Sequence, residues 1–164
     1  MTSIIKVDQI QNAAGATALT IDNSGRILQP AKPAFKAYNG ANAWQSVAAS
    51  GVYYNLAFNT KDHDIGGNYD TSTYTFTCPV NGVYMFGAQV MHDANSSAQI
   101  SIAVNGTNIA FAENSVQGDM VQVATTHNMT SGDTVNAKIK LGNVNSDDWY
   151  ANSSYSFFYG YFIG

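Results

Sequence analysis

Short runs of alternating apolar and polar residues fill the chain from residue 33 onward and constrain its fold more than any other feature. They are rich in Tyr, Phe, Val, Ile and Thr, and clusters of Gly, Asn, Asp and Ser separate them. A period of two is typical of β-strands, and β-branched and aromatic side chains suit a pleated surface. We predict about eight strands, some of them split or merged. The runs span residues 35–38, 52–59, 74–78, 82–92, 98–104, 108–112, 120–129, 135–141 and 154–163.

The turns and the low charge content fix the class of fold. Asn105 and Gly106 predict a tight hairpin, because both central residues of such a turn need a positive φ, and residues 131–133 predict a second connection. Charged residues make up only 11% of the chain, and Glu113 is its only glutamate. The chain therefore lacks the charged side chains that the solvent-exposed face of a long amphipathic helix needs. Evenly spaced strands without helices predict an all-β fold, an antiparallel jelly-roll sandwich.

A change of composition near residue 30 divides the chain. Pro30 and Pro33, two of its three prolines, lie three residues apart and mark a boundary. Residues 1–29 contain no aromatic side chain and cannot form a core of their own. We therefore predict an N-terminal anchoring arm at residues 1–29 and a single domain at residues 30–164.

The arm is nevertheless patterned like strands. Aliphatic residues alternate with polar neighbours, and residues 22–25 (Asp-Asn-Ser-Gly) predict a turn. Two short strands that need a partner are the favoured interpretation, and a helical turn or two within residues 8–18 is the alternative. We expect the arm to be disordered alone and to order on its partner, by strand addition or by packing into a groove. The anchoring residues are expected to be Ile4, Ile5, Val7, Ile10, Leu19 and Ile21.

Charge and cysteine content exclude several classes of function. The net charge of −4 and the pI near 5.0 leave no basic patch for a phosphate backbone, so no nucleic-acid partner is expected. Cys78 has no CxxC partner and predicts a small buried residue. No run approaches the roughly 20 apolar residues that span a bilayer, and residues 1–6 do not resemble a signal peptide. We expect a soluble protein that is not conventionally secreted and does not insert into membranes.

No catalytic constellation emerges from the sequence. The three histidines, His63, His92 and His127, lie far apart, and no nucleophile elbow, metal-spaced His pair or phosphate-binding loop occurs. Acidic residues cluster at residues 62–70 and 147–148, but without a pattern that supplies the roughly six to eight oxygens of a calcium site. Solvated loop charge is the favoured interpretation. We expect no enzyme activity, no cofactor and no metal site.

Two strands are apolar on both faces, residues 83–91 and 157–163. An antiparallel sandwich normally wets its outer face, so a strand of this kind needs a second cover. Another copy of the same chain is the simplest one. The subunit interface is predicted to contain Val83, Met85, Phe157, Tyr159, Tyr161 and Ile163.

The order and spacing of several short elements resemble the C1q-like domain, a tumour-necrosis-factor-like jelly roll, over roughly residues 31–164. This resemblance implies a ten-stranded jelly roll, a compact homotrimer and chain ends that lie near one another at its base. The resembling elements are Pro33-Ala34-Phe35, Phe58-Asn59, Asn68-Tyr69-Asp70, Tyr74-Thr75-Phe76-Thr77-Cys78-Pro79, Gly82-Val83-Tyr84-Met85-Phe86, Val104-Asn105-Gly106, Gly132-Asp133-Thr134-Val135 and Phe158-Tyr159-Gly160-Tyr161-Phe162-Ile163.

The arm resembles a different group of proteins. Residues 5–15 (IKVDQIQNAAG) are similar to the opening of many bacteriophage, especially cyanophage, virion structural and tail-fibre proteins, and residues 19–27 resemble short units of trimeric fibres. Neither a collagen-like stalk nor a signal peptide, which secreted C1q-like proteins carry, is present. The resemblance implies a component of a phage particle, made in the host cytoplasm.

Three functions follow from these resemblances. The first is a homotrimeric capsid decoration (cement) protein, held to the major capsid protein or another virion protein by three arms whose weak contacts add up. The second is the receptor-binding tip of a tail or head fibre that recognises a host surface glycan. The third is a free C1q-like lectin or adhesion module outside any virus.

Aromatic residues in loop-like contexts are the candidates for a glycan or partner contact. Tyr and Trp faces stack on sugars, and Asn side chains hydrogen-bond hydroxyls. Trp44 with Tyr38, and Trp149 with Tyr150, are expected in loops. The prediction rests on Trp149 and Tyr150; for most of the ten tyrosines, packing in the core or between subunits is favoured.

Overall fold

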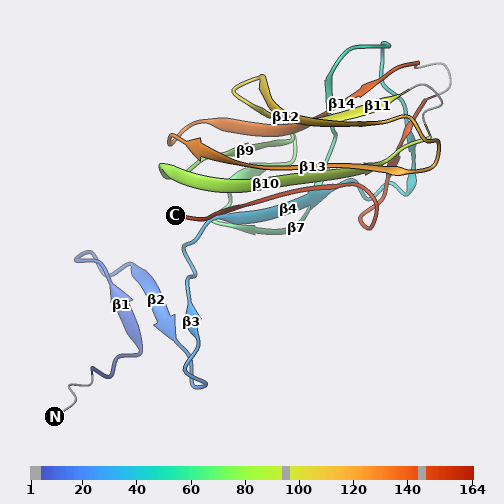
Figure 1. The fold of residues 1–164 in the computed structure, drawn as a ribbon. Helices are drawn as coiled ribbons and strands as arrows, with labels where there is room; N and C mark the ends of the chain where they lie inside the picture. Colours follow the sequence, from blue (N-terminus) through green and yellow to red (C-terminus); the bar gives the residue numbers. More distant parts are fainter. Residues whose placement is uncertain (1–4, 94–96, 144–146) are drawn as a thin grey trace. The chain divides into compact units, whose positions relative to one another are not determined.

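The structure is a computed structural model that describes residues 5–93, 97–143 and 147–164. Ile4, one of the predicted anchoring residues, lies outside this part of the chain. The chain forms two compact units, Met1–Lys32 and Pro33–Gly164, which we call the arm and the head. Every element of regular structure in the described ranges is a strand (Figure 1), and no helix there is long and apolar enough to cross a membrane.

The arm is a small antiparallel meander. Its strands β1 (Gln9–Gln11), β2 (Thr17–Ile21) and β3 (Ile27–Leu28) pair in the order β1-β2-β3. Side-chain oxygens close both turns: Asn12 Oδ1 accepts from the backbone N–H groups of Ala14 and Ala16, and Asp22 caps the second turn in the same way. The helical alternative for residues 8–18 is therefore wrong. The arm also has three strands rather than the two predicted, and they pair with one another.

The head is a two-layer sandwich, and its first layer has five strands. They pair in the order β13-β10-β16-β4-β7, and every pairing is antiparallel. Neighbouring strands in this layer come from distant parts of the chain, as the interleaved colours of Figure 1 show. The strands are β4 (Ala34–Tyr38), β7 (Thr60–Ile65), β10 (Gly82–Met91), β13 (Met120–Met129) and β16 (Phe157–Phe162).

The second layer has six strands, and a separate pair of strands lies outside both layers. Five strands follow the order β12-β11-β14-β9-β8, and β6 pairs with β14. The separate pair consists of β5 (Ala43–Gln45) and β15 (Trp149–Ala151). The six strands are β6 (Tyr54–Asn55), β8 (Tyr69–Asp70), β9 (Thr75–Thr77), β11 (Ala98–Val104), β12 (Thr107–Asn114) and β14 (Thr134–Leu141).

Aromatic rings join the two layers. Phe35 of β4 stacks on Tyr69 and Phe76 of the opposite layer, with ring centroids 5.0 and 4.7 Å apart, and meets Phe158 edge-on at 4.9 Å. Phe35 and Phe158 are almost wholly buried. Alternation in β4, β10 and β16 sends every second residue into this core, as the period of two predicts. The all-β antiparallel sandwich expected from the sequence is confirmed.

Several strand boundaries differ from those predicted. The predicted strand at residues 52–59 shrinks to β6, and the run at 154–163 begins only at Phe157. The prediction missed β7, whose sequence Thr-Lys-Asp-His-Asp-Ile is mostly polar, because an edge strand exposes most of its side chains. The hairpin at Asn105 and Gly106 is confirmed, with φ angles of 49° and 84°.

Both ends of the head lie at the same end of the sandwich. The carbonyl of Pro33 accepts a hydrogen bond from Phe162 N (2.9 Å), and the carbonyl of Gly164 accepts one from Val83 N (2.7 Å). Strand β10 runs from this terminal end to the opposite one, a distance of roughly 30 Å for its 10 residues. We call the opposite end the distal end.

Candidate functional site

The five-stranded layer carries a second set of aromatic and apolar side chains on the face that points away from the core. Cross-strand register places Met85 opposite Tyr161, Gly87 opposite Tyr159 and Gln89 opposite Phe157. Residues of the same strands with the other parity, such as Phe86 and Phe158, are fully buried. We call this outward surface the aromatic face. Its members include all six residues predicted for the subunit interface: Val83, Met85, Phe157, Tyr159, Tyr161 and Ile163.

Two contacts fix the side chains of the aromatic face: Tyr159 packs closely over Gly87, and the Lys36 ammonium lies over the ring of Phe157. Tyr159 lies across Gly87, so that a Cβ placed on Gly87 would be 2.6 Å from Tyr159 Cε1. Lys36 Nζ lies 5.0 Å from the centroid of Phe157, and Phe157 in turn lies 6.2 Å from Tyr159. A hollow of about 510 Å³ opens on the layer, lined by Ala88, Gln89, Gln122, Val123, Ala124, Phe157 and Tyr159.

This face is exposed in the single chain. Val83 is 37% exposed, Tyr161 46% and Ile163 47%, which is high for large apolar side chains grouped on one sheet. A flat sheet face with these residues and few charges has the composition of an interface rather than of a catalytic cleft. The structure thus brings the predicted interface residues together on one surface.

Trp149 and Tyr150, the two residues predicted to contact a glycan, have side chains that point in opposite directions. Trp149 is only 3% exposed and meets Phe58 edge-on in the core at 5.9 Å, so the prediction for this residue is wrong. Tyr150 is half-buried and faces outward, where its ring lies 4.9 Å from that of Trp44, its partner on β5. The expectation of loops is also corrected, because both residues belong to β15.

Around Trp44 and Tyr150, which the sequence analysis names as contact candidates, the structure assembles a wider surface whose other members the sequence did not indicate. Tyr155 lies 6.1 Å from Tyr150 and is 43% exposed. Asn42 Oδ1 accepts hydrogen bonds from Tyr150 Oη (2.9 Å) and Asn152 Nδ2 (2.8 Å). We call these five residues, Asn42, Trp44, Tyr150, Asn152 and Tyr155, the distal ribbon. Pairing across more than 100 residues creates it, and no local pattern signals it.

In the arm, register brings four aliphatic residues to one face. Ile10 is opposite Leu19, and Ile21 is opposite Ile27, so all four side chains lie on the same side of the meander. Ile10 and Ile27 are 49% and 64% exposed. We call this surface the aliphatic arm face. Of the predicted anchoring residues it contains Ile10, Leu19 and Ile21, whereas Ile5 and Val7 precede β1, and the sequence reasoning missed Ile27.

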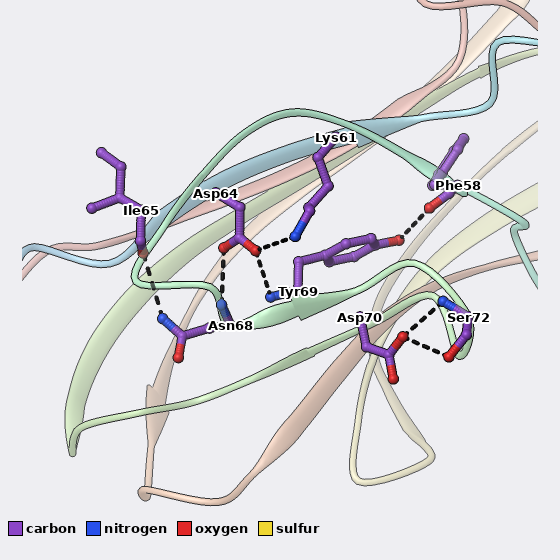
Figure 2. Close-up of polar contacts among 8 residues, drawn as sticks. All are labelled: Phe58, Lys61, Asp64, Ile65, Asn68, Tyr69, Asp70 and Ser72. Carbon is purple, nitrogen blue, oxygen red and sulfur yellow. Dashed lines mark hydrogen bonds and ion pairs between the residues drawn. The ribbon is translucent and has the colours of Figure 1, made fainter.

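Two of the acidic residues at 62–70, Asp64 and Asp70, accept hydrogen bonds that fix the local backbone (Figure 2). The carboxylate of Asp64, only 4% exposed, accepts from the backbone N–H groups of Asn68 (3.0 Å) and Tyr69 (3.2 Å) and pairs with Lys61 Nζ (3.0 Å). Asp70 accepts from Ser72 N and Oγ. Burial raises the pKa of Tyr69, whose hydroxyl donates to the Phe58 carbonyl. Asp64 is thus a buried anchor of this loop, which corrects its interpretation as solvated charge.

No metal-binding cluster is assembled by the described residues. His63 is exposed beside Asp62, His92 is buried at the end of β10, and no cluster of three metal-ligating side chains occurs in these ranges. Cys78 is buried, as predicted, and its Sγ donates to the Val80 carbonyl. Burial lowers the pKa of His92, and the charges of Asp119, Asp93 and Asp147 oppose this shift.

Solved structures of other proteins share this two-layer architecture. The globular domain of a zebrafish complement 1qA protein superposes with a TM-score of 0.62 at 18% identity, covering 81% of this chain and 98% of that one. Murine APRIL at pH 8.0 gives 0.65 at 11%, covering 80% and 99%. The Eiger tumour necrosis factor of S. frugiperda gives 0.63 at 8%, covering 81% and 93%.

The family is shown by the sequence itself. The family model described as the C1q domain matches residues 35–163, which is most of the chain and nearly all of the head. Domains of this fold typically form trimers, and they are generally binding or structural modules rather than enzymes. The chain therefore belongs to the C1q domain family.

Proposed function

We propose that this protein is a homotrimeric structural component of a bacteriophage virion, a capsid decoration (cement) protein that attaches through its N-terminal arm. The exposed aromatic face is the observation that supports a trimer. Burying it against two other copies removes the exposed parts of Val83, Tyr161 and Ile163 from water. Because each is less than half exposed in the single chain, each contributes less than half of the about 1.5–3 kcal/mol of a fully buried apolar side chain, before the cost of association.

The aliphatic arm face supports attachment. The meander has no buried side chain among its described residues, so it gains little from folding alone. Aliphatic side chains that are exposed together favour contact with another surface, because the contact removes them from water. Three arms carried by one trimer bind a shell far more tightly than one arm does, because the second and third contacts are intramolecular.

The virion assignment rests on the resemblance of residues 5–15 and 19–27 to phage structural proteins, and on the mechanical character of the molecule. The described residues contain no cluster of three metal-ligating side chains, and the aliphatic arm face belongs to a compact unit of its own. A small trimer whose arms carry exposed aliphatic side chains suits the local threefold points of a shell, where it can bridge neighbouring capsomers.

The decisive test is to locate the protein. Mass spectrometry of separated capsids and tails, together with imaging of virions labelled at the head, should find it on the capsid surface at a multiple of three copies. Its presence only at a fibre end, or its absence from purified particles, would overturn the capsid assignment.

A second candidate function is the tip of a tail or head fibre that recognises a host surface glycan. The distal ribbon favours it, because it lies where Met91 of β10 ends and His92 bridges to Trp149, at the end away from Pro33 and Gly164. A head held at its terminal end would present this surface outward. Fibre-end labelling in the imaging experiment would support this candidate over the first.

A further inference from the structure

The distal ribbon presents flat aromatic surface to solvent. Trp44 is 42% exposed and Tyr155 is 43% exposed, with Tyr150 between them. The ring of Tyr150 is tilted by 52° from that of Trp44 and by 51° from that of Tyr155, so the rings are not stacked upon one another. An exposed aromatic ring of this kind can pack against the C–H groups of a small ring-shaped ligand.

Polar groups around these rings are fixed in place. Asn42 Oδ1 accepts from both Tyr150 Oη and Asn152 Nδ2, and Asn152 Oδ1 accepts from the backbone N–H of Ser154 (2.9 Å). The amide nitrogen of Asn42 carries two N–H donors, and its oxygen has a fixed position. Because these bonds hold the amides before a ligand arrives, little conformational entropy is lost on binding.

The ribbon has no charged member, which restricts the class of ligand. Its five residues are amides and aromatics. A site without a cationic side chain offers no ion-pair partner to an anionic ligand such as a sulfated or sialylated sugar. Aromatic faces combined with amides match a ligand that has apolar C–H patches and many hydroxyls.

We propose that the distal ribbon binds a neutral pyranose sugar, with the C–H face of the ring on Trp44 and its hydroxyls hydrogen-bonded by Asn42 and Asn152. This deepens the second candidate function by naming the residues and the ligand class. A single sugar of about a dozen heavy atoms is expected to bind with a Kd on the order of millimolar. Three ribbons in one assembly would bind a polysaccharide much more tightly.

The test uses the full-length protein and a panel of methyl glycosides of glucose, galactose, N-acetylglucosamine and rhamnose, each titrated to about ten times the expected Kd. Binding is followed by saturation-transfer NMR and by tryptophan fluorescence. Because Trp149 is buried and Trp44 exposed, a sugar-dependent change in emission should come from Trp44. At least one glycoside should bind.

Variants then locate the site. Trp44→Ala should weaken binding at least tenfold, whereas Trp44→Phe, which keeps a flat ring, should retain saturation transfer and lose the fluorescence change. Phe111→Ala removes a 66%-exposed aromatic residue from β12 and is the matched control that should bind like the parent. Binding by none of the four glycosides, or undiminished binding by Trp44→Ala, would overturn the proposal.

Failure of this proposal and failure of the candidate function are distinguishable. Sugar binding by the isolated protein requires no virion, so a ribbon that binds sugar on a protein located at capsid threefold points would keep the site and remove the fibre-tip role. If the protein is located at fibre ends and its ribbon binds no glycoside, the fibre-tip role is kept and the sugar site is removed.

Discussion

Tyr159 of β16 lies directly over Gly87 of β10, and its ring occupies the space that a side chain at Gly87 would need. The pair forms the middle of the aromatic face. Glycine inside a strand normally weakens it, and its presence here is explained by this close approach.

Gly87→Ala should therefore push the Tyr159 ring aside and destabilise the head by about 1–3 kcal/mol, the usual range for overpacking. Urea denaturation measures this change. Adding Tyr159→Ala should recover part of the loss, because the obstructing ring is then gone. Gly40→Ala is the control: its Cβ would meet Tyr38 at an ordinary 3.5 Å, so stability should hardly change. Equal effects at both glycines would contradict the steric explanation.

Assembly gives the second prediction. Tyr159→Asp should convert the trimer to monomer in sedimentation equilibrium at micromolar concentration, because a charge buried without a partner at an interface costs about 3–5 kcal/mol. Phe111→Asp, an equally drastic change on the six-stranded layer, should leave the trimer intact. A parent protein that sediments as a monomer or a dimer would refute the trimer.

The period of two was enough to predict the aromatic face, because strand parity alone decides which residues share a side. Phe157, Tyr159 and Tyr161 could be grouped without knowing any neighbour. Trp44 and Tyr150 could be named as candidates, but their pairing into the distal ribbon could not be predicted, because it depends on which strand pairs with residues 149–151. Locally, Trp149 and Tyr150 look equivalent, and only the contact of Trp149 with Phe58 makes one of them core.

The loop at Asp64 gives the third prediction. Asp64→Ala removes the acceptor for two backbone N–H groups and the partner of Lys61, and should destabilise the head by about 2–3 kcal/mol. Asp70→Ala, at an exposed carboxylate bonded to Ser72, should have a much smaller effect. Thermal unfolding of the two variants side by side checks the difference, and equal shifts in Tm would show that Asp64 is not the anchor.

Acid sensitivity gives the fourth prediction. Burial lowers the pKa of His92 below its ordinary 6.5, so the unfolded chain binds a proton there more readily than the folded head does. This contribution to stability is present above pH 6.5 and is lost progressively as the pH falls below it. Burial and the charges of Asp93 and Asp147 raise the pKa of Asp148, which opposes this trend near its own titration range.

An NMR titration of the His92 ring isolates its part, and its midpoint should lie below 6.5. His92→Asn should flatten the dependence of stability on pH between about 5 and 7. A His92 midpoint at or above 6.5 would contradict the burial argument.

The arm gives the last prediction. The head contains its own core and belongs to a compact unit separate from Met1–Lys32, so deleting residues 1–29 should leave a folded trimer that no longer co-purifies with virions. Ile27→Asp places a charge on the aliphatic arm face and should reduce attachment strongly. Leu28→Asp lies on the opposite side of β3 and is the matched control that should attach nearly as well as the parent. Full attachment of the truncated head would mean that the head itself holds the shell, and loss of the trimer on truncation would mean that the arm contributes to the assembly.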